Sequence, residues 1–212
     1  MKLFSPVCKG REPFPEPIAG DVFGSQNESM QSALIIFATK EGQTQKVAVR
    51  ILEHLENAGI TGHLVNAADS TALKQIDLGS YDLLVFGASM HAGGLEREIV
   101  QFINANTSQI ESKANSFFLV LLSAATIDPK LKSESLADAR QKMHRQLMMK
   151  FDDMEMIAGA LAYSKYSLPM KWLMRRIASK AGEGTDISRD YEYTDWTQVE
   201  RYAERLVGMC VK

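Results

Sequence analysis

The segment LIIFATKEGQT, residues Leu34–Thr44, predicts a buried strand, a tight polar loop and the start of a helix, in that order. Its first five residues are a short apolar run, which is typical of a strand that is covered on both faces. The loop after this run is polar and contains Gly42. Over residues 43–58, apolar side chains recur at the spacing of one helical face, namely Val47, Ile51, Leu52 and Leu55.

A loop between a strand and a helix directs several free backbone N–H groups, and the positive end of the helix dipole, at one point. Such a corner can bind an anion. Gly42 lets the backbone approach a ligand closely, and the hydroxyls of Thr39 and Thr44 are further donors. The pattern Thr-x-x-Gly-x-Thr resembles the phosphate loop of flavodoxins and differs from the P-loop and dinucleotide motifs. The loop by itself leaves two interpretations open, a phosphate site or an ordinary strand–loop–helix corner.

Length and composition predict one globular domain. The chain has 212 residues, of which 45% are hydrophobic and 24% are charged. Its net charge of -2 gives no general reason to expect nucleic acid as a partner. No apolar run approaches the ~20 residues that span a bilayer, and no signal peptide is evident. Cys8 and Cys210 lie outside any metal or redox spacing, so we expect a reducing, cytoplasmic compartment.

Residues 1–29 differ from the rest of the chain. Prolines and glycines lie close together there, and no helical or strand period is present. We therefore expect a disordered or loosely attached N-terminal arm, followed by one domain over residues 30–212. Met30 directly precedes the first strand, so we also hypothesise that it is the biological start and that the residues before it are a misassigned extension. A native chain that begins at Met1 would contradict this hypothesis.

Buried strands and amphipathic helices alternate along most of the chain. This order predicts an α/β fold with a doubly wound parallel sheet and right-handed crossovers. Ligands of such sheets bind beyond the carboxyl ends of the strands, where we expect three polar loops, at residues 39–44, 88–94 and 123–126. The expected strands are residues 34–38, 63–66, 81–86, 117–122 and 154–161, and the expected long helices are residues 43–58, 95–105 and 131–151.

A last helix is expected to begin at Asp195. The pattern Asp195-x-x-Gln198 predicts a capping box, in which Asp195 accepts from backbone N–H groups and the Gln198 side chain reaches back. We therefore assign Asp195 and Trp196 to capping and packing rather than to catalysis. The buried stripe of this helix is expected to be Val199, Tyr202, Ala203, Leu206 and Val207.

A basic insertion, residues 163–184, is not needed by a minimal five-stranded domain. Its central part, residues 164–181, contains no acid and predicts an amphipathic helix with Pro169 in the first turn and Gly182 at the end. Three placements are open: on anionic lipid, against the sheet with a solvated basic face, or beside a pocket for a large anionic, apolar ligand. The expected apolar face is Met170, Leu173, Met174, Ile177, Ala178 and Ala181, and the expected membrane or substrate contacts are Lys165, Lys171, Trp172, Arg175, Arg176 and Lys180.

Several further motifs follow the first loop in a fixed order. They are IAGALxY at residues 157–163, the basic insertion, GExTD at residues 182–186 and YTDW at residues 193–196. Together with the first loop, they resemble the menaquinone-dependent protoporphyrinogen oxidase family of bacteria, whose members have a flavodoxin fold. The resemblance covers about residues 31–210. General flavodoxins share the first loop but lack the basic insertion and the YTDW ending.

The resemblance implies a five-stranded parallel sheet in the order 2-1-3-4-5, with the basic helical insertion after the fifth strand. It implies FMN as cofactor and oxidation of protoporphyrinogen IX to protoporphyrin IX in haem biosynthesis, with electrons passed to menaquinone or another quinone. It also implies a peripheral position on the inner, cytoplasmic face of the cell membrane, while homo-oligomer formation stays open. The implied cofactor-binding residues are Thr39, Lys40, Glu41, Gly42, Gln43, Thr44, Ala88, Ser89, Met90, His91, Gly93, Ser123, Ala124, Ala125 and Thr126.

Two features of these loops depart from the flavodoxin pattern. Glu41 stands where flavodoxins commonly have Thr, and a carboxylate repels a phosphate unless its side chain turns away. The second loop has no Tyr or Trp to stack on a flavin, and its only ring is His91. Stacking of His91 on the flavin and exposure of His91 to solvent are both open. The other histidines are scattered, so we expect no metal site.

Two other functions stay open beside the porphyrinogen-oxidising enzyme. One is a flavodoxin-like electron carrier or quinone reductase without porphyrin activity. The other is a non-enzymatic FMN-binding module that the basic helix anchors. The basic, apolar insertion favours the enzyme, because a soluble carrier usually presents an acidic face to its partners. The sequence requires no catalytic acid–base pair, because a flavin carries the redox chemistry itself.

Overall fold

The computed structural model describes residues 31–91, 94–181 and 185–210. The expected N-terminal arm, Met30 and Gly93 lie outside the described residues. The helices and strands are β1 (Ser32–Phe37), α1 (Gln43–Asn57), β2 (Thr61–Asn66), α2 (Ser70–Gln75), η1 (Leu78–Ser80), β3 (Leu83–Ser89), α3 (Arg97–Ala105), α4 (Thr107–Glu111), β4 (Ala114–Leu121), η2 (Leu122–Ala125), α5 (Pro129–Gln146), β5 (Asp153–Ala158), β6 (Ala160–Leu161), η3 (Tyr163–Lys165), α6 (Leu168–Ala181), β7 (Tyr191–Glu192) and α7 (Trp196–Cys210).

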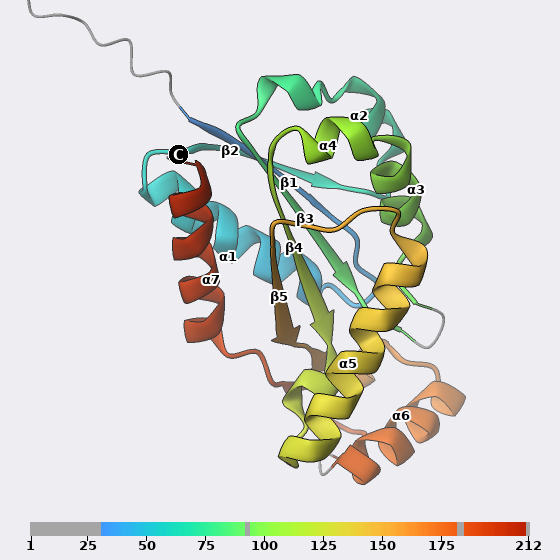
Figure 1. The fold of residues 1–212 in the computed structure, drawn as a ribbon. Coiled ribbons are helices and arrows are strands. Elements are labelled where there is room, and N and C mark those ends of the chain that lie inside the picture. The colour runs from blue at the N-terminus through green and yellow to red at the C-terminus, as the bar shows by residue number, and fades with distance from the viewer. Residues whose placement is uncertain (1–30, 92–93, 182–184, 211–212) are drawn as a thin grey trace, which may run out of the picture.

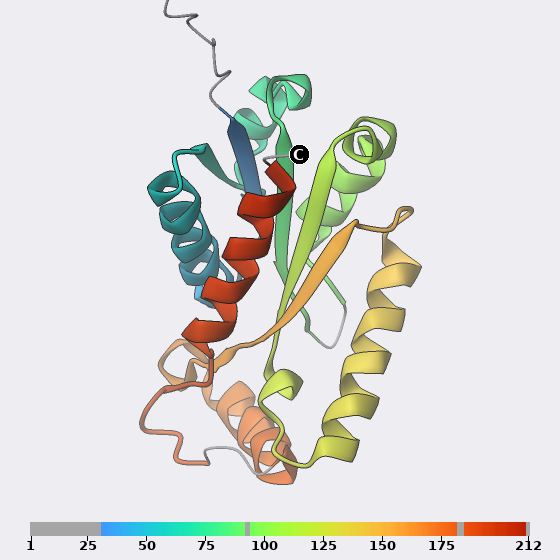
Figure 2. The same ribbon diagram turned by 60° about the vertical axis from the view of Figure 1, so that its left-hand side comes forward.

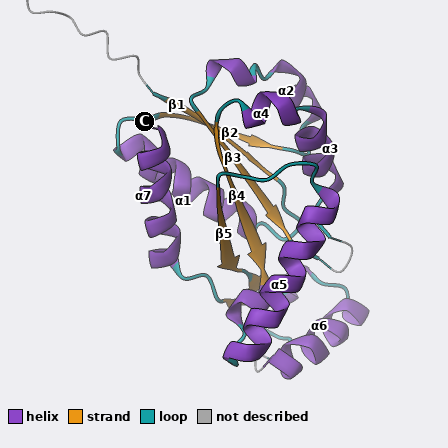
Figure 3. Cartoon of the chain, in the orientation of Figure 1, coloured by secondary structure: helices purple, strands orange, loops and turns teal. Residues whose placement is uncertain are grey.

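The centre of the molecule is a five-stranded parallel sheet in the order β2-β1-β3-β4-β5, which confirms the predicted order (Figure 1). Helices α1 and α7 cover one face of the sheet, and α2, α3, α4 and α5 lie on the other side (Figure 1). Helices and strands alternate along the chain (Figure 3), because a parallel strand pair needs a long crossover that usually contains a helix.

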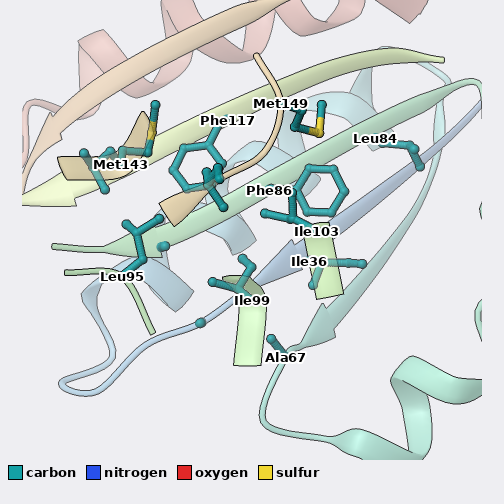
Figure 4. Close-up of a cluster of buried hydrophobic side chains, with 14 of the residues drawn as sticks. Ile36, Ala67, Leu84, Phe86, Leu95, Ile99, Ile103, Phe117, Met143 and Met149 are labelled. Atoms are coloured by element: carbon teal, nitrogen blue, oxygen red, sulfur yellow. The ribbon is translucent and has the colours of Figure 1, made fainter. Parts of the chain in front are cut away.

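Two apolar clusters hold the three layers together. Each one joins a face of the sheet to the helices that cover it, so β1, β3 and β4 are buried at almost every position. Burial on both faces explains why these strands are continuous apolar runs rather than alternating patterns. The cluster under α1 and α7 includes Ile35, Ile51, Val85, Phe118 and Leu206. The opposite cluster includes Ile36, Phe86, Ile99, Ile103, Phe117 and Met143 (Figure 4).

Helix α5 is shorter than the sequence predicts. It spans Pro129–Gln146 rather than residues 131–151. Its start is earlier because Asp128 caps the first turn and a proline at the first helical position is compatible with a helix. Its end is earlier because Leu147 has an extended backbone and is buried in the core. Packing of the residues after the helix, rather than their helical propensity, sets this boundary.

The predicted fifth strand, residues 154–161, is divided into two strands. The strand β5 ends at Ala158, and the N–H of Gly159 donates to the carbonyl of Leu121 at 3.1 Å. The next two residues form β6, which leaves the main sheet and pairs antiparallel with β7. Because α6 lies between β6 and β7 in the chain, this small sheet ties the two ends of the basic insertion together.

The capping box before α7 is confirmed for Asp195 and wrong for Gln198. Asp195 Oδ1 accepts from the N–H of Thr197 at 2.9 Å and from the N–H of Gln198 at 3.2 Å. The Gln198 side chain does not reach back, because its Nε2 donates to Glu155 and to the Met156 carbonyl at 3.1 Å. The glutamine therefore connects α7 to β5.

Helix α6 confirms the predicted helix in the basic insertion. It spans Leu168–Ala181, with Pro169 in its first turn. It lies beyond the carboxyl ends of the strands and joins neither helical layer (Figures 1 and 2). The interpretation in which this helix packs on the sheet is therefore wrong. Its expected end at Gly182, and the side chains of its expected apolar face, lie outside what the structure describes.

Candidate functional site

Three loops meet at the carboxyl edge of the sheet, as the sequence predicts. They follow β1, β3 and β4, which are neighbours in the sheet. Backbone hydrogen bonds connect these segments, since Ala38 N donates to Gly87 O at 2.8 Å and Met90 N donates to Val120 O at 2.9 Å. Doubly wound sheets bind their ligands at this edge, so the three loops form the candidate functional site.

The first loop enters α1 at Gly42, whose φ of 98° lies in the left-handed region. Glycine adopts this conformation without strain. Gly42 N donates to Thr39 Oγ1 at 2.9 Å, and no side chain in the described part of the chain caps the start of α1. The N–H groups of the first helical turn therefore lack a side-chain acceptor, and together with the helix dipole they favour an anion.

The hydroxyl of Thr44 is buried without a hydrogen-bond partner among the described residues. The whole residue is only 1% exposed. A buried donor that is left unpaired costs about 1–3 kcal/mol. A ligand oxygen at the start of α1 would accept a hydrogen bond from this hydroxyl and remove the penalty. The hydroxyl is therefore an independent sign of an anion site at this loop.

The side chain of Gln43 is engaged within the protein. Its Nε2 donates to Thr194 Oγ1 at 2.8 Å, and that hydroxyl donates to the Ala158 carbonyl at 2.7 Å. These bonds tie the first loop to the end of β5 and to the YTDW motif. Of the expected cofactor contacts, Gln43 can therefore offer its backbone, whereas Lys40 is exposed.

The second loop joins the first through a polar cluster around His91. Ser89 Oγ lies 2.9 Å from His91 Nε2 and donates to the carboxylate of Glu96, which also accepts from Ser89 N at 3.1 Å. His91 Nε2 lies 3.6 Å from Glu96 Oε1 and 3.6 Å from Glu41 Oε2. His91 therefore has polar partners as well as solvent, and its stacking on a flavin stays a prediction.

Glu96 is the member of this cluster that the sequence analysis did not identify. It is only 8% exposed, and a buried carboxylate needs hydrogen-bond donors to offset its lost hydration. The one local signal is an acid directly before α3, which normally indicates only a favourable interaction with the helix dipole. Glu41, the departure in the first loop, places its carboxylate 3.6 Å from His91 Nε2, so its side chain faces a polar group of the second loop.

The third loop, residues 123–126, has less exposed surface than we expect of a loop that contacts a cofactor. Ala124 is 5% exposed and Thr126 is 6% exposed, and Ala124 belongs to the apolar cluster beside α5. Ser123 and Ala125 are half-buried and therefore have more surface to offer a ligand. In the second loop, Ala88 is fully buried within β3.

The basic insertion reaches the first loop through Lys165. Its ammonium group donates to the backbone carbonyl of Glu41 and lies 3.3 Å from the position of a Cβ built on Gly42. The neighbouring Tyr166 is half-buried, and burial together with the charge of Glu41 raises its pKa to about 12. The insertion thus adds a cation and an aromatic ring to the edge of the candidate anion site.

The other described cations of the insertion lie along α6. Trp172 is 60% exposed, and the guanidinium of Arg175 lies 5.3 Å from the centre of its ring. Arg176 is exposed and Lys171 is half-buried, whereas the side chain of Lys180 lies outside the described residues. No helix in the described part of the chain is long and apolar enough to cross a bilayer. The exposed residues of α6 thus include two arginines, Trp172 and the apolar Leu168.

A cavity of about 610 Å³ lies along the exposed side of α1, beside the first loop. Its lining includes Lys46 and Arg50. Lys46 pairs with Glu192 at 2.7 Å, and Arg50 pairs with Glu200 at 2.5 Å. These two cations already have carboxylate partners, and a third, Lys165, donates to the backbone carbonyl of Glu41 at the edge of the first loop.

Comparison with known proteins gives this fold a family. The family model described as "Flavodoxin domain" matches residues 34–188, which include the first loop and the basic helix α6. The chain belongs to the flavodoxin domain family. A flavodoxin domain implies a flavin cofactor, and the uncapped start of α1 with the unpartnered Thr44 hydroxyl fits the phosphate of such a cofactor.

Two curated relatives of this flavodoxin domain are both named protoporphyrinogen IX dehydrogenase (quinone). The relative from Escherichia coli K12 is 26% identical over 179 residues, which cover 84% of this chain and 96% of the relative. The relative from Leishmania major is 24% identical over 177 residues, which cover 83% of this chain and 74% of the relative. Both matches extend over most of the chain.

Proposed function

We propose that this flavodoxin domain protein is an FMN-dependent oxidoreductase that converts protoporphyrinogen IX to protoporphyrin IX in haem biosynthesis and passes the electrons to menaquinone. The shared name of the two relatives supports the substrate and a quinone acceptor. The observation that carries the proposal is the buried Thr44 hydroxyl at the uncapped start of α1, because a flavin phosphate supplies the acceptor that it lacks among the described residues.

The first loop, residues Thr39–Thr44, would bind the phosphate of FMN. Backbone N–H groups of the loop and the first turn of α1 would donate to the phosphate oxygens, together with the Thr44 hydroxyl. Gly42 has no Cβ, which leaves space for the Lys165 ammonium group close to the loop. The ring system would lie between the second and third loops, with Ser89, Met90, His91, Ser123 and Ala125 as the expected neighbours that the structure leaves partly accessible or polar.

The flavin, when bound, supplies the two-electron oxidation of the substrate and the transfer of electrons to the quinone. The residues of this chain hold it at the carboxyl edge of the sheet. Helix α6 lies beyond the same edge (Figures 1 and 2) and carries Lys171, Trp172, Arg175 and Arg176. A porphyrinogen is a large apolar macrocycle with carboxylates at its rim, so exposed cations beside an aromatic ring match its chemistry.

We further propose that the end of the molecule with α6 rests on the cytoplasmic face of the membrane. Ile127, just before α5, Leu131, in the first turn of α5, and Leu168 and Trp172, on α6, are large apolar side chains that are exposed. These two segments lie at the same end of the molecule in Figures 1 and 2. Apolar side chains beside cations are typical of a surface that binds anionic lipid. A quinone that resides in the bilayer would then be within reach.

The test is anaerobic mixing of the FMN-loaded protein with protoporphyrinogen IX and a menaquinone analogue, followed by porphyrin fluorescence. A quinone-dependent rise above the uncatalysed rate supports the proposal. If the fluorescence stays at background while the flavin is bound and reducible, the protein is an electron carrier or a general quinone reductase. If FMN does not bind, the phosphate site at the first loop is wrong.

A charge-reversal variant tests the role of α6. Changing Lys171, Arg175 and Arg176 to Glu should weaken sedimentation with anionic vesicles by about 100-fold or more, since each cation near such a surface contributes about 1 kcal/mol. FMN affinity should be unchanged. Unchanged vesicle binding together with unchanged substrate kinetics would exclude a role for this face. A control with the same change in net charge reverses exposed cations elsewhere, namely Lys74, Arg140 and Arg201.

A further inference from the structure

The hydrogen bonds of the polar cluster between the first two loops fix which ring nitrogen of His91 carries a proton. The proposed function does not use this feature. The carboxylate of Glu96 is buried and accepts hydrogen bonds from both the N–H and the hydroxyl of Ser89. A hydroxyl has only one proton. Because Ser89 donates that proton to Glu96, its oxygen accepts from His91 Nε2, which lies 2.9 Å away. The neutral imidazole of His91 therefore carries its proton on Nε2.

The other ring nitrogen of His91 is then a proton acceptor. Nδ1 makes no hydrogen bond to any residue in the described part of the chain, and the side chain is 28% exposed. Glu41 and Glu96 each place a carboxylate oxygen 3.6 Å from Nε2 on the other side of the ring. Two negative charges at this distance stabilise a positive charge that forms on the imidazole. The ring is thus built to take up a proton at Nδ1.

Charged and polar groups reach this ring from several segments. Glu96 directly precedes α3, and Glu41 belongs to the first loop, where its carbonyl accepts from Lys165. Tyr166 lies close enough for the Glu41 charge to raise its pKa. Within the described ranges, His91 is the only basic side chain within 4.0 Å of the Glu41 or Glu96 carboxylate. Among the described basic side chains, the carboxylates of Glu41 and Glu96 therefore share one close neighbour, the imidazole of His91.

We propose that His91 is the catalytic base of the oxidation and that Ser89, Glu96 and Glu41 are its positioning residues. The inference rests on the proposed function, because it requires a substrate whose oxidation releases a proton. Its location supports it, since His91 lies in the second loop and touches Glu41 of the first loop, at the edge where the flavin would be held.

The first two-electron oxidation of a porphyrinogen breaks one C–H bond at a methylene bridge and one N–H bond of a neighbouring pyrrole. The hydrogen of the C–H bond would leave with its electron pair as a hydride, and a bound flavin would supply the oxidant that accepts it. The proton of the N–H bond moves to Nδ1 of His91, and the electron pair of that bond becomes part of the new double bond. The partly exposed imidazole then releases the proton to water.

The variant His91→Asn tests this role in single-turnover experiments without oxygen. Reduction of the bound flavin by protoporphyrinogen IX should slow by about 100-fold or more, which is the usual contribution of a general base. Reoxidation of the chemically reduced flavin by a quinone analogue, measured in protein saturated with FMN, should stay within about twofold of the wild type. Added imidazole should restore part of the rate. The matched control is His144→Asn, on an exposed position of α5.

The wild type separates the two proposals. If protoporphyrinogen IX does not reduce the flavin of the wild type, the proposed function is wrong. If it reduces the flavin of the wild type and of His91→Asn at rates within about twofold of each other, only the inference about His91 is wrong.

A measurement on the FMN-free protein needs no activity. Nuclear magnetic resonance of isotope-labelled histidine should show the neutral His91 with its proton on Nε2. The variants Ser89→Ala and Glu96→Gln should allow a mixture of both tautomers, because they remove the chain of hydrogen bonds that orients the ring. A neutral wild-type His91 with its proton mainly on Nδ1 would overturn the assignment of Nδ1 as the acceptor.

Discussion

Replacing Thr44 with Val should change the stability of the FMN-free protein and its affinity for FMN in opposite directions. Valine keeps the branched shape of the side chain and replaces the hydroxyl with a methyl group. In the FMN-free protein that hydroxyl is buried and has no partner among the described residues. Its removal should raise the free energy of unfolding by about 1–3 kcal/mol, the penalty of an unpaired buried donor. For a chain of this size, each kcal/mol raises the Tm by about 2–4 °C.

The affinity for FMN should fall in the same variant. In the complex, the Thr44 hydroxyl would donate to a charged phosphate oxygen. A hydrogen bond to a charged group contributes about 1.5–3 kcal/mol, so its loss should raise the Kd for FMN by about 10- to 100-fold. No general loss of structure produces this combination, because a damaged fold would lose stability and affinity together.

Two assays on one preparation decide the outcome. Thermal unfolding of the FMN-free protein gives the Tm, and quenching of flavin fluorescence during titration gives the Kd. Thr61→Val, at an exposed position of β2, is the matched control and should change stability by less than about 0.5 kcal/mol. A lower Tm for Thr44→Val would mean that the hydroxyl has a partner in the FMN-free protein. An unchanged Kd would mean that the first loop does not bind the phosphate.

Three other predictions concern side-chain packing between strands, the loss of stability at acid pH and the basic insertion. Gly87→Ala should lower the free energy of unfolding by about 1–3 kcal/mol or more, measured in urea, because its Cβ would lie 2.0 Å from a ring carbon of Phe118. A hydrogen bond from Lys46 lowers the pKa of Glu192 below its ordinary value of 4.5. The stability from this shift is present above pH 4.5 and is lost as the pH falls through the lowered pKa of the folded state, so Glu192→Gln should unfold with a weaker dependence on pH in the acid range. Lys165→Met should raise the Kd for FMN at low ionic strength, and added salt should reduce the difference from the wild type, because an exposed charge is screened; a salt-independent effect would indicate packing instead.

The sheet and its three loops could be predicted because their signals are local. A continuous apolar run such as Leu34–Ala38 fits only a strand that is buried on both faces, and the structure buries all five residues. Gly42 was expected to let the backbone approach a ligand closely, and the structure adds that its φ of 98° lies in the left-handed region that favours glycine. Strand order followed from the family resemblance, since periodicity alone does not say which strands are neighbours.

Two predictions are wrong at the ends of helices. In both, a residue can contact either its neighbours in the chain or residues that are distant in the sequence. Leu147 continues a helical pattern in the sequence, but it leaves the helix to enter the core. Gln198 has the spacing of a capping box, but Glu155 and the Met156 carbonyl on β5 are its actual partners. In both cases the distant contact outweighs a local preference that is worth only a few tenths of a kcal/mol to about 1 kcal/mol.

The sequence alone was enough to predict an α/β sheet, a polar loop between a strand and a helix at residues 39–44 and a basic helix, because each depends on residues that are close together in the chain. The tertiary structure was needed to show that Thr44 has a buried hydroxyl without a partner in the described part of the chain, and that Lys165 contacts the carbonyl of Glu41 from 124 residues away. It was also needed to place His91 between two carboxylates from different loops. Such contacts form only when neighbouring parallel strands bring their carboxyl ends to one edge, and no local pattern encodes which side chains meet there.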